Sequence, residues 1–292
     1  MKKKVTKAII PAAGFGTRML PFTKAVPKEL TPLVDKPVLQ YVVEEAVSSG
    51  IEDIMIIISS GKEAVIRHFE SAPELEMRLL ESGKDKILSA VRASNSPARI
   101  EYIYQPQLNG LGGAIRLAEN FAAGEPVAVL LGDTVLDSSA ARPVTGQLID
   151  VYEKYGSSVI ALEQVDAEKV SSYGIADAEL LAGNIFKLHD LMEKPSPEDA
   201  PGDLAVASRY LFTPGIFSAL QKTTCGLHNE IQLTDAIRLL LKTENVFGCQ
   251  VSGKRFDLGT PDGFIAANVE FAMRCPELRS KLMPRLRNIL NH

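Results

Sequence analysis

Short apolar runs rich in β-branched residues alternate with amphipathic segments through the first half of the chain. This pattern predicts strands that alternate with helices. The predicted strands cover residues 5–10, 53–59, 99–104 and 126–133. Between them, residues 37–50 give the clearest helical pattern, with a proline suited to the first turn and a glycine that can end the helix. Because such strands need crossover connections, we expect an α/β fold with a doubly wound, mostly parallel (mixed) sheet, Rossmann-like, covered by helices on both faces.

The second half has longer strand patterns followed by helical ones. Strands are predicted near 157–165, 183–190 and 204–212, and helices near 215–221, 232–242 and 261–274. A polar, proline-rich loop is expected over 194–203, yet apolar runs continue on both sides of it. We therefore expect one domain over residues 1–292.

Composition narrows the class of protein. The chain is 46% hydrophobic and 23% charged, as expected for a globular protein with a sizeable core. A net charge of -4 without a dense basic face argues against nucleic-acid binding, and no apolar run reaches membrane-spanning length. Three widely spaced cysteines, Cys225, Cys249 and Cys275, fit a reduced, cytoplasmic protein.

A glycine-rich turn follows the first predicted strand and is the strongest local sign of chemistry. Gly14 and Gly16 allow backbone N–H groups to approach a phosphate closely. A P-loop is excluded because its Gly-Lys-Ser/Thr ending is missing, and a dinucleotide loop lacks its third glycine, where Met19 stands. A nicotinamide-dependent oxidoreductase is therefore disfavoured. Arg18 and Lys28 instead supply fixed cations, which suit a triphosphate better than the diphosphate of a dinucleotide and disfavour a plain tight turn with solvated side chains.

The turn belongs to the longer segment GFGTRMLPFTKAVPKELTPLVDKP, which resembles the signature of sugar-1-phosphate nucleotidyltransferases. The form TKAVPKE is similar to the bacterial UTP-glucose-1-phosphate uridylyltransferases within that family. The resemblance continues in order along the chain through QPQLNGLGGA, YGIA, MEKP, SRYLF, NEIQLTDAI and FDLGTPDGF. It implies a nucleotidyltransferase fold and the reaction of UTP with glucose 1-phosphate to give UDP-glucose and pyrophosphate.

That reaction needs charge neutralisation more than a general base. A phosphate monoester has its second pKa near ~6, so the nucleophile is already ionised at neutral pH. Two unit charges ~4 Å apart repel by ~4 kcal/mol at an effective dielectric constant of ~20. Catalysis is then mainly alignment and electrostatic stabilisation.

The resemblance also implies roles for individual residues. Arg18, Lys28 and Lys194 would be catalytic cations, the last on the phosphate of the sugar 1-phosphate. Asp133, the last residue of a predicted strand at the edge where α/β sheets bind ligands, and Asp257 would hold Mg²⁺. Taken alone, Asp133 could equally be a turn or capping residue. Nucleotide contacts are expected from Ala12, Ala13, Gly14, Gly16, Thr17, Gln105 and Gly110, and sugar contacts from Gly174, Glu193 and Lys194.

Three positions depart from the family pattern. Gly113 stands where the family usually has histidine, Thr134 follows the strand-end aspartate, and Ser208 replaces a usual glycine. Because base and sugar choice depend on pocket shape, a thymidylyltransferase that uses dTTP remains an alternative. A non-catalytic nucleotide-sugar binding protein is a second one, disfavoured by the intact set of charged residues. The family also suggests a homo-oligomer, a dimer or tetramer, with no nucleic-acid or membrane partner.

Overall fold

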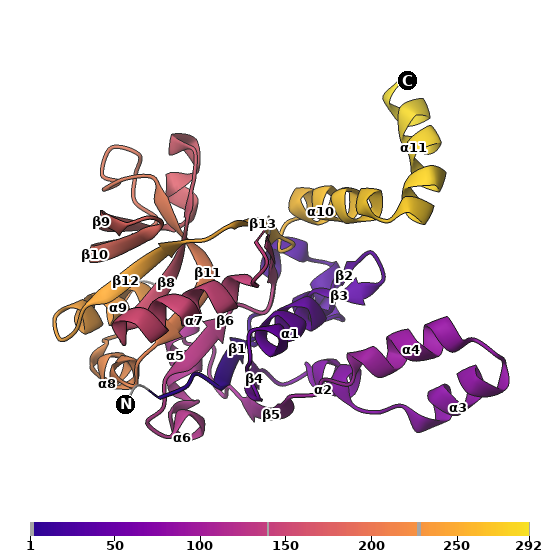
Figure 1. The fold of residues 1–292 in the computed structure, drawn as a ribbon, viewed down its shortest axis with the longest axis horizontal. Coiled ribbons are helices and arrows are strands. Elements are labelled where there is room, and N and C mark those ends of the chain that lie inside the picture. Colours follow the sequence, from indigo (N-terminus) through magenta and orange to yellow (C-terminus); the bar gives the residue numbers. More distant parts are fainter. Residues whose placement is uncertain (1–2, 139, 227–228, 292) are drawn as a thin grey trace.

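A mixed nine-stranded sheet forms the centre of the protein in a computed structural model that describes residues 3–138, 140–226 and 229–291 (Figure 1). Within these residues the strand order is β5-β4-β1-β6-β11-β8-β12-β10-β9. The strands are β1 (Lys7–Pro11), β4 (Asp53–Ile58), β5 (Arg99–Tyr104), β6 (Val127–Leu130), β8 (Ser158–Gln164), β9 (Gly174–Ala182), β10 (Ile185–Glu193), β11 (Leu204–Phe212) and β12 (Val246–Gln250).

The two halves of the sheet differ in strand direction. β5, β4, β1 and β6 are parallel, as the alternating pattern predicts. From β6 onward the pairing is mostly antiparallel, because β11 runs against both β6 and β8, and β10 runs against both β12 and β9. Among these later strands β8 and β12 are parallel. The prediction of a mostly parallel sheet is therefore wrong for the second half, where β9 and β10 join through a two-residue turn and need no crossover helix.

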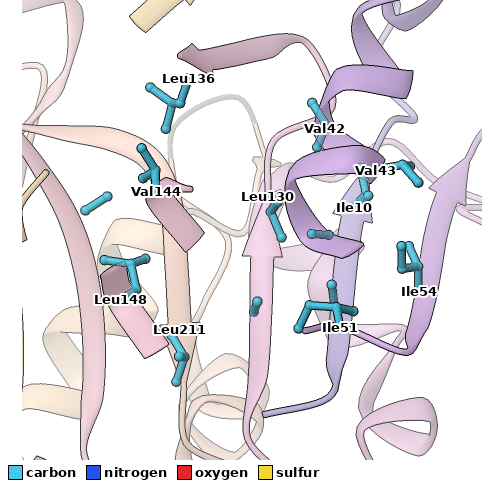
Figure 2. Close-up of a cluster of buried hydrophobic side chains, with 14 of the residues drawn as sticks. Ile10, Val42, Val43, Ile51, Ile54, Leu130, Leu136, Val144, Leu148 and Leu211 are labelled. Carbon is cyan, nitrogen blue, oxygen red and sulfur yellow. The ribbon is translucent and has the colours of Figure 1, made fainter. Parts of the chain in front are cut away.

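Helices cover both faces of the sheet. The side chains of a strand alternate between faces, so Ile10 and Leu130 lie on one face while Ile9 and Val129 lie on the other. On the first face they share one apolar cluster with α1 (Val38–Ser48) and α7 (Val144–Tyr155); in Figure 2, Val42 and Val43 lie near Ile10, and Leu148 lies on the side of Leu211. On the second face the packing helices are α5 (Leu111–Arg116), α8 (Gly215–Lys222) and α9 (Leu233–Leu241).

A two-stranded antiparallel ribbon lies outside the main sheet. It consists of β7 (Thr134–Ser138) and β13 (Gly253–Asp257) and packs with α10 (Pro261–Arg274) in a small apolar cluster of its own. The predicted strand 126–133 is therefore too long, since β6 ends at Leu130 and the chain turns before β7 begins. Without this turn Asp133 would not lie between the sheet and the ribbon.

The remaining elements are mostly peripheral. They are β2 (Pro32–Leu33), β3 (Lys36–Pro37), α2 (Glu63–Phe69), α3 (Pro73–Glu81), α4 (Asp85–Ser94), α6 (Glu119–Ala122) and α11 (Pro276–Leu290). The α3–α4 hairpin and the α10–α11 arm extend away from the sheet (Figure 1). None of the helices in the described ranges combines the length and the apolarity needed to cross a membrane.

A buried ion pair ties the main sheet to the ribbon. Arg209 in β11 lies 2.7 Å from the carboxylate of Glu45 in α1, and both side chains are buried. The same guanidinium donates to the Thr134 carbonyl at 3.0 Å and to the Ser208 carbonyl at 3.0 Å. Ser208 has a left-handed φ of 59° at a bulge in β11, a backbone conformation that glycine would adopt with less strain than serine. Arg209 thus fixes the first residue of β7, next to Asp133.

We expect Arg209→Met to lower the free energy of unfolding by about 3–5 kcal/mol, because Glu45 would be left as an unpaired charge away from water. Urea unfolding followed by circular dichroism measures this loss. The matched control is Arg78→Met, since Arg78 pairs with Glu74 at an exposed site and such pairs contribute only about 0–1 kcal/mol. A loss no larger than that of the control would contradict the structural role of the pair.

Candidate active site

A cavity of about 480 Å³ opens where β1 and β6 end, beside the glycine-rich turn. This is the edge at which parallel strands of α/β proteins present their ligands. Eight of the residues predicted from the sequence line it: Ala13, Gly14, Gly16, Thr17, Lys28, Gln105, Gly110 and Asp133. Ala12 lies buried directly beneath the turn. A second cavity of about 560 Å³, lined by His189 and Arg238, contains none of the predicted residues.

The glycine-rich turn has the conformation that its sequence predicts. Gly16 has φ of 67°, a left-handed value that glycine adopts without strain. A Cβ atom at Gly16 would lie 3.0 Å from the Cβ atom of Lys28, so a larger residue would also crowd the Lys28 side chain. The Thr23 hydroxyl donates to the Gly16 carbonyl at 2.8 Å and closes the loop on itself. The loop is therefore shaped before any ligand arrives.

Lys28 and Asp133 form an ion pair in the cavity, with 2.7 Å between Nζ and Oδ2. Burial is the largest single influence and would raise the pKa of Asp133, but the Lys28 charge, the hydrogen bonds from Lys28 and from the backbone, and the Arg18 charge together hold that pKa below its ordinary value of 3.8. Burial alone would likewise lower the pKa of Lys28, but Asp133 and Glu29 hold it above 10.5. Both groups are therefore charged at neutral pH.

Arg18 and Asp257 form a second, more exposed ion pair, with 3.3 Å between Nη1 and Oδ2. Asp257 is the last residue of β13 and pairs directly with Thr134, the residue that follows Asp133. The ribbon thus brings the two predicted metal ligands to one place although 124 positions separate them in the sequence, from 133 to 257. Two of the three predicted phosphate-binding cations, Lys28 and Arg18, thus neutralise one carboxylate each.

The pair of carboxylates fits a hard divalent cation. Among the described residues, no group of three or more His, Cys, Asp or Glu side chains is placed to hold a metal ion. Mg²⁺, however, commonly uses one or two protein carboxylates and completes its coordination with substrate phosphates and water. Asp133 and Asp257 are a donor set of that kind, and each has a cation beside it, Lys28 and Arg18 respectively.

Sequence reasoning missed Lys62 and Glu29, which lie under the loop. Lys62 Nζ donates to the carbonyls of Ala12 and Gly14, at 2.6 Å each, and to the Glu29 carboxylate at 2.8 Å. Burial raises the pKa of Glu29 and lowers the pKa of Lys62. Glu29 follows Lys28 in the segment that resembles the family signature, so its position could have marked it as a site residue. Nothing in the sequence around Lys62 marks that residue in the same way.

The predicted sugar-binding residues come together through the pairing of β9 with β10. Gly174 lies opposite Glu193 in this pair, and Glu193 Oε2 accepts a hydrogen bond from Thr234 at 2.6 Å. Lys194 has a left-handed φ of 46°, and its amino group is 3.8 Å from Glu193 Oε1. These residues form a second group and do not line the cavity of the glycine-rich turn.

Gln105 follows β5 and reaches the floor of the cavity, where it is 7% exposed. Its amide nitrogen donates to Asn109 Oδ1 at 3.1 Å and to the Gly110 carbonyl at 3.4 Å. Gly110 has φ of 93°, and a Cβ atom there would lie 2.9 Å from the Ile231 carbonyl oxygen. Glycine is therefore required at 110 both for backbone conformation and for space.

Comparisons with known proteins agree with this geometry. A sequence model of the family described as "Nucleotidyl transferase" matches residues 7–273. The UTP–glucose-1-phosphate uridylyltransferase of Bacillus subtilis (strain 168) is 48% identical over 289 residues, which cover 99% of this chain and 98% of that protein. The chain belongs to the nucleotidyltransferase family, whose members generally use a divalent metal.

Two solved structures are similar over nearly their whole length. A UDP-glucose pyrophosphorylase complexed with UDP-glucose has a TM-score of 0.86 and 38% identity, and the match covers 93% of this chain and 100% of that one. A UTP-bound UDP-glucose pyrophosphorylase from Acinetobacter baumannii has a TM-score of 0.89 and 31% identity, with 97% and 98% covered. The mixed α/β fold is thus that of the nucleotidyltransferases.

The ion pair of Lys28 with Asp133 predicts how stability depends on pH. Because the folded-state pKa of Asp133 lies below 3.8, its contribution is present above about pH 4 and is lost as the pH falls through the folded-state value. We expect Asp133→Asn to lower the free energy of unfolding by about 1–3 kcal/mol, because Lys28 loses a charged partner.

This loss should be constant between about pH 5 and pH 7 and should shrink below about pH 4. Urea unfolding at each pH measures it. Asp137→Asn is the control, because Asp137 lies on the same ribbon but forms an exposed pair with Arg274. A loss that already shrinks between pH 5 and pH 7 would show that the pKa of Asp133 is not depressed.

Proposed function

We propose that this protein is a UTP–glucose-1-phosphate uridylyltransferase. It would transfer UMP from UTP to glucose 1-phosphate and release pyrophosphate. The observation that carries the proposal is the double ion pair beside the glycine-rich turn, Lys28 with Asp133 and Arg18 with Asp257. Relatives that are similar along nearly the whole chain are named for UTP–glucose-1-phosphate uridylyltransferase or UDP-glucose pyrophosphorylase.

In this mechanism the residues of the protein mainly align the two substrates and neutralise the charge of their phosphates. The loop of Ala13, Gly14 and Gly16 cradles the triphosphate through backbone N–H groups. Arg18 contacts the departing β- and γ-phosphates, since its planar fork matches phosphate oxygens. Lys28 turns from Asp133 to the α-phosphate, where negative charge accumulates in the transition state. No residue has to remove a proton, because the attacking phosphate is already ionised.

Asp133 and Asp257 would then be free to hold Mg²⁺. When bound, the ion screens the repulsion between the two phosphate groups. Lys194 would bring in the phosphate of the sugar and Glu193 would bind sugar hydroxyls, with Gly174 leaving room between them. Support for this arrangement comes from the β9–β10 pairing and from the hydrogen bond of Thr234 to Glu193.

We also propose that residues 1–292 form one domain that acts in the cytoplasm and assembles into homo-oligomers. The single large sheet, built from strands between Lys7 and Gln250, supports one domain. The three cysteines are free, which suits a reducing compartment. Exposed apolar side chains on the two projecting helical segments, Leu75, Met77, Leu80, Ile289 and Leu290, support association between copies.

We expect purified protein with Mg²⁺ and glucose 1-phosphate to release pyrophosphate faster from UTP than from dTTP. A coupled pyrophosphate assay with each nucleotide measures kcat/KM. Omission of the sugar phosphate is the control for simple triphosphate hydrolysis. Equal rates with dTTP would remove the specificity for UTP, and faster turnover of dTTP would favour a thymidylyltransferase. Binding of UDP-glucose without any pyrophosphate release would indicate a non-catalytic binding protein.

We expect Asp133→Ala and Asp257→Ala each to lower Mg²⁺-dependent kcat/KM by more than about 100-fold, since each would remove one of two protein ligands. The same pyrophosphate assay, run across a range of Mg²⁺ concentrations, measures the effect. Asp137→Asn again serves as the control, because Asp137 is a carboxylate of the same ribbon that faces Arg274. A near-normal rate in either alanine variant would refute the metal role of that residue.

A further inference from the structure

We propose that Asn109 is a positioning residue that determines which pyrimidine the cavity accepts, and that Gly113 provides the space it needs. Asn109 would act through Gln105, whose amide it holds with the nitrogen turned toward the protein. The amide oxygen is then the group presented to the base. This inference rests on the proposed function only in taking the cavity beside Gln105 as the nucleotide site.

The orientation of the Gln105 amide follows from its two partners. The Gly110 carbonyl oxygen can only accept a hydrogen bond, so the group that faces it at 3.4 Å must be the amide nitrogen. Asn109 Oδ1 accepts from the same nitrogen at 3.1 Å. With both N–H groups directed at protein acceptors, Gln105 cannot offer a donor to a ligand without breaking one of these bonds.

The Gln105 amide oxygen has no donor partner among the residues that the structure describes, and Gln105 lines the cavity. An acceptor at this place matches uracil, whose N3–H is a donor between two carbonyl groups. It opposes cytosine, whose N3 is an acceptor. A buried polar group left without a partner is costly, so a fixed acceptor discriminates far more strongly than a freely rotating amide.

Two hydrogen bonds fix the backbone of Asn109, one through its N–H and one through its carbonyl. Its N–H donates to the Gln107 carbonyl at 2.9 Å, and its carbonyl accepts from the Ile231 N–H at 2.7 Å. The side chain then lies over Gly113 in α5, where a Cβ atom would be 2.0 Å from Asn109 Oδ1 and 2.6 Å from its Cγ. Any side chain at 113 would therefore displace Asn109.

This contact gives a physical reason for the departure at position 113. The histidine that the family usually has there cannot coexist with Asn109 in its present position. Glycine at 113 and asparagine at 109 thus act as a pair, and a change in either one leaves the Gln105 amide held only by its longer hydrogen bond to the Gly110 carbonyl. Asn109 and Gly113 do not line the cavity themselves; they lie behind Gln105, which does.

The test is the equilibrium binding of UTP and of CTP to the full-length protein, measured by calorimetry without sugar phosphate. We expect the wild type to prefer UTP by about 100-fold, and Asn109→Ala to reduce this ratio about tenfold, because one lost hydrogen bond to the amide is worth roughly that factor. The conservative variant Asn109→Asp keeps an acceptor for the Gln105 nitrogen and should keep the ratio near that of the wild type.

Gly113→Ala tests the other half of the pair. It should reduce the UTP:CTP ratio as Asn109→Ala does, and the double variant should lose no more than either single one, since both act on the same amide. A merely structural role would weaken the binding of both nucleotides equally and leave the ratio unchanged. An unchanged ratio in Asn109→Ala, or a wild type that does not distinguish UTP from CTP, would overturn the inference.

The outcome is separable from that of the proposed function. A wild type that binds UTP with the expected preference but releases no pyrophosphate would refute the transferase activity and leave the role of Asn109 standing. A wild type that turns over UTP and glucose 1-phosphate, with an unchanged ratio in both variants, would refute the role of Asn109 and leave the activity standing. Failure to bind UTP at all would refute both.

Discussion

The buried contact of Lys62 with Glu29 is the interaction on which the site depends. The Lys62 ammonium group donates to the backbone carbonyls of Ala12 and Gly14 and to the Glu29 carboxylate. The loop and the segment that carries Lys28 are thereby fixed to each other from below, although no regular strand joins them. A buried ion pair stabilises only when its remaining hydrogen-bonding groups are satisfied. Here the backbone of the loop satisfies those of Lys62, so the loop and the pair stabilise each other.

Beside the contact of Lys62 with Glu29 lie the two ion pairs of the site, Lys28 with Asp133 and Arg18 with Asp257. Lys28 faces Asp133 and Arg18 faces Asp257, so each cation is held in place by an opposite charge that offsets the repulsion between the two cations. In the proposed function, a triphosphate with its metal ion would offer both sets of charges new partners at once: phosphates for the cations and the metal for Asp133 and Asp257. Such an exchange would conserve the number of ion pairs and so limit the cost of desolvating a polyanion. The Arg209 hydrogen bond to the Thr134 carbonyl ties the ribbon to the sheet beside these charges.

The sequence predicts the parallel half of the fold and the residues of the cavity well, because both depend on local patterns. Gly14, Gly16, Gln105 and Gly110 follow strands whose alternation is visible in the chain, and the cavity contains them all. The second half could not be predicted in the same way. The antiparallel insertion of β11 between β6 and β8, and the pairing of β7 with β13, join segments far apart in sequence and leave no local periodicity. For that reason the proximity of Asp133 to Asp257, and the place of Lys62, emerge only from the tertiary structure.

The ribbon of β7 and β13 also sets the order in which the site can be completed. The contact between Arg18 and Asp257 spans 239 positions, and that between Lys28 and Asp133 spans 105. Contacts of such separation close large loops and form late in folding. During synthesis the parallel strands β1, β4, β5 and β6 leave the ribosome long before β13 does, because chains emerge from the N-terminus. During most of translation, Arg18 and Lys28 therefore have at most one of their two carboxylate partners, Asp133. A chain that stops short of β13 would lack Asp257 and so leave Arg18 without its counter-charge.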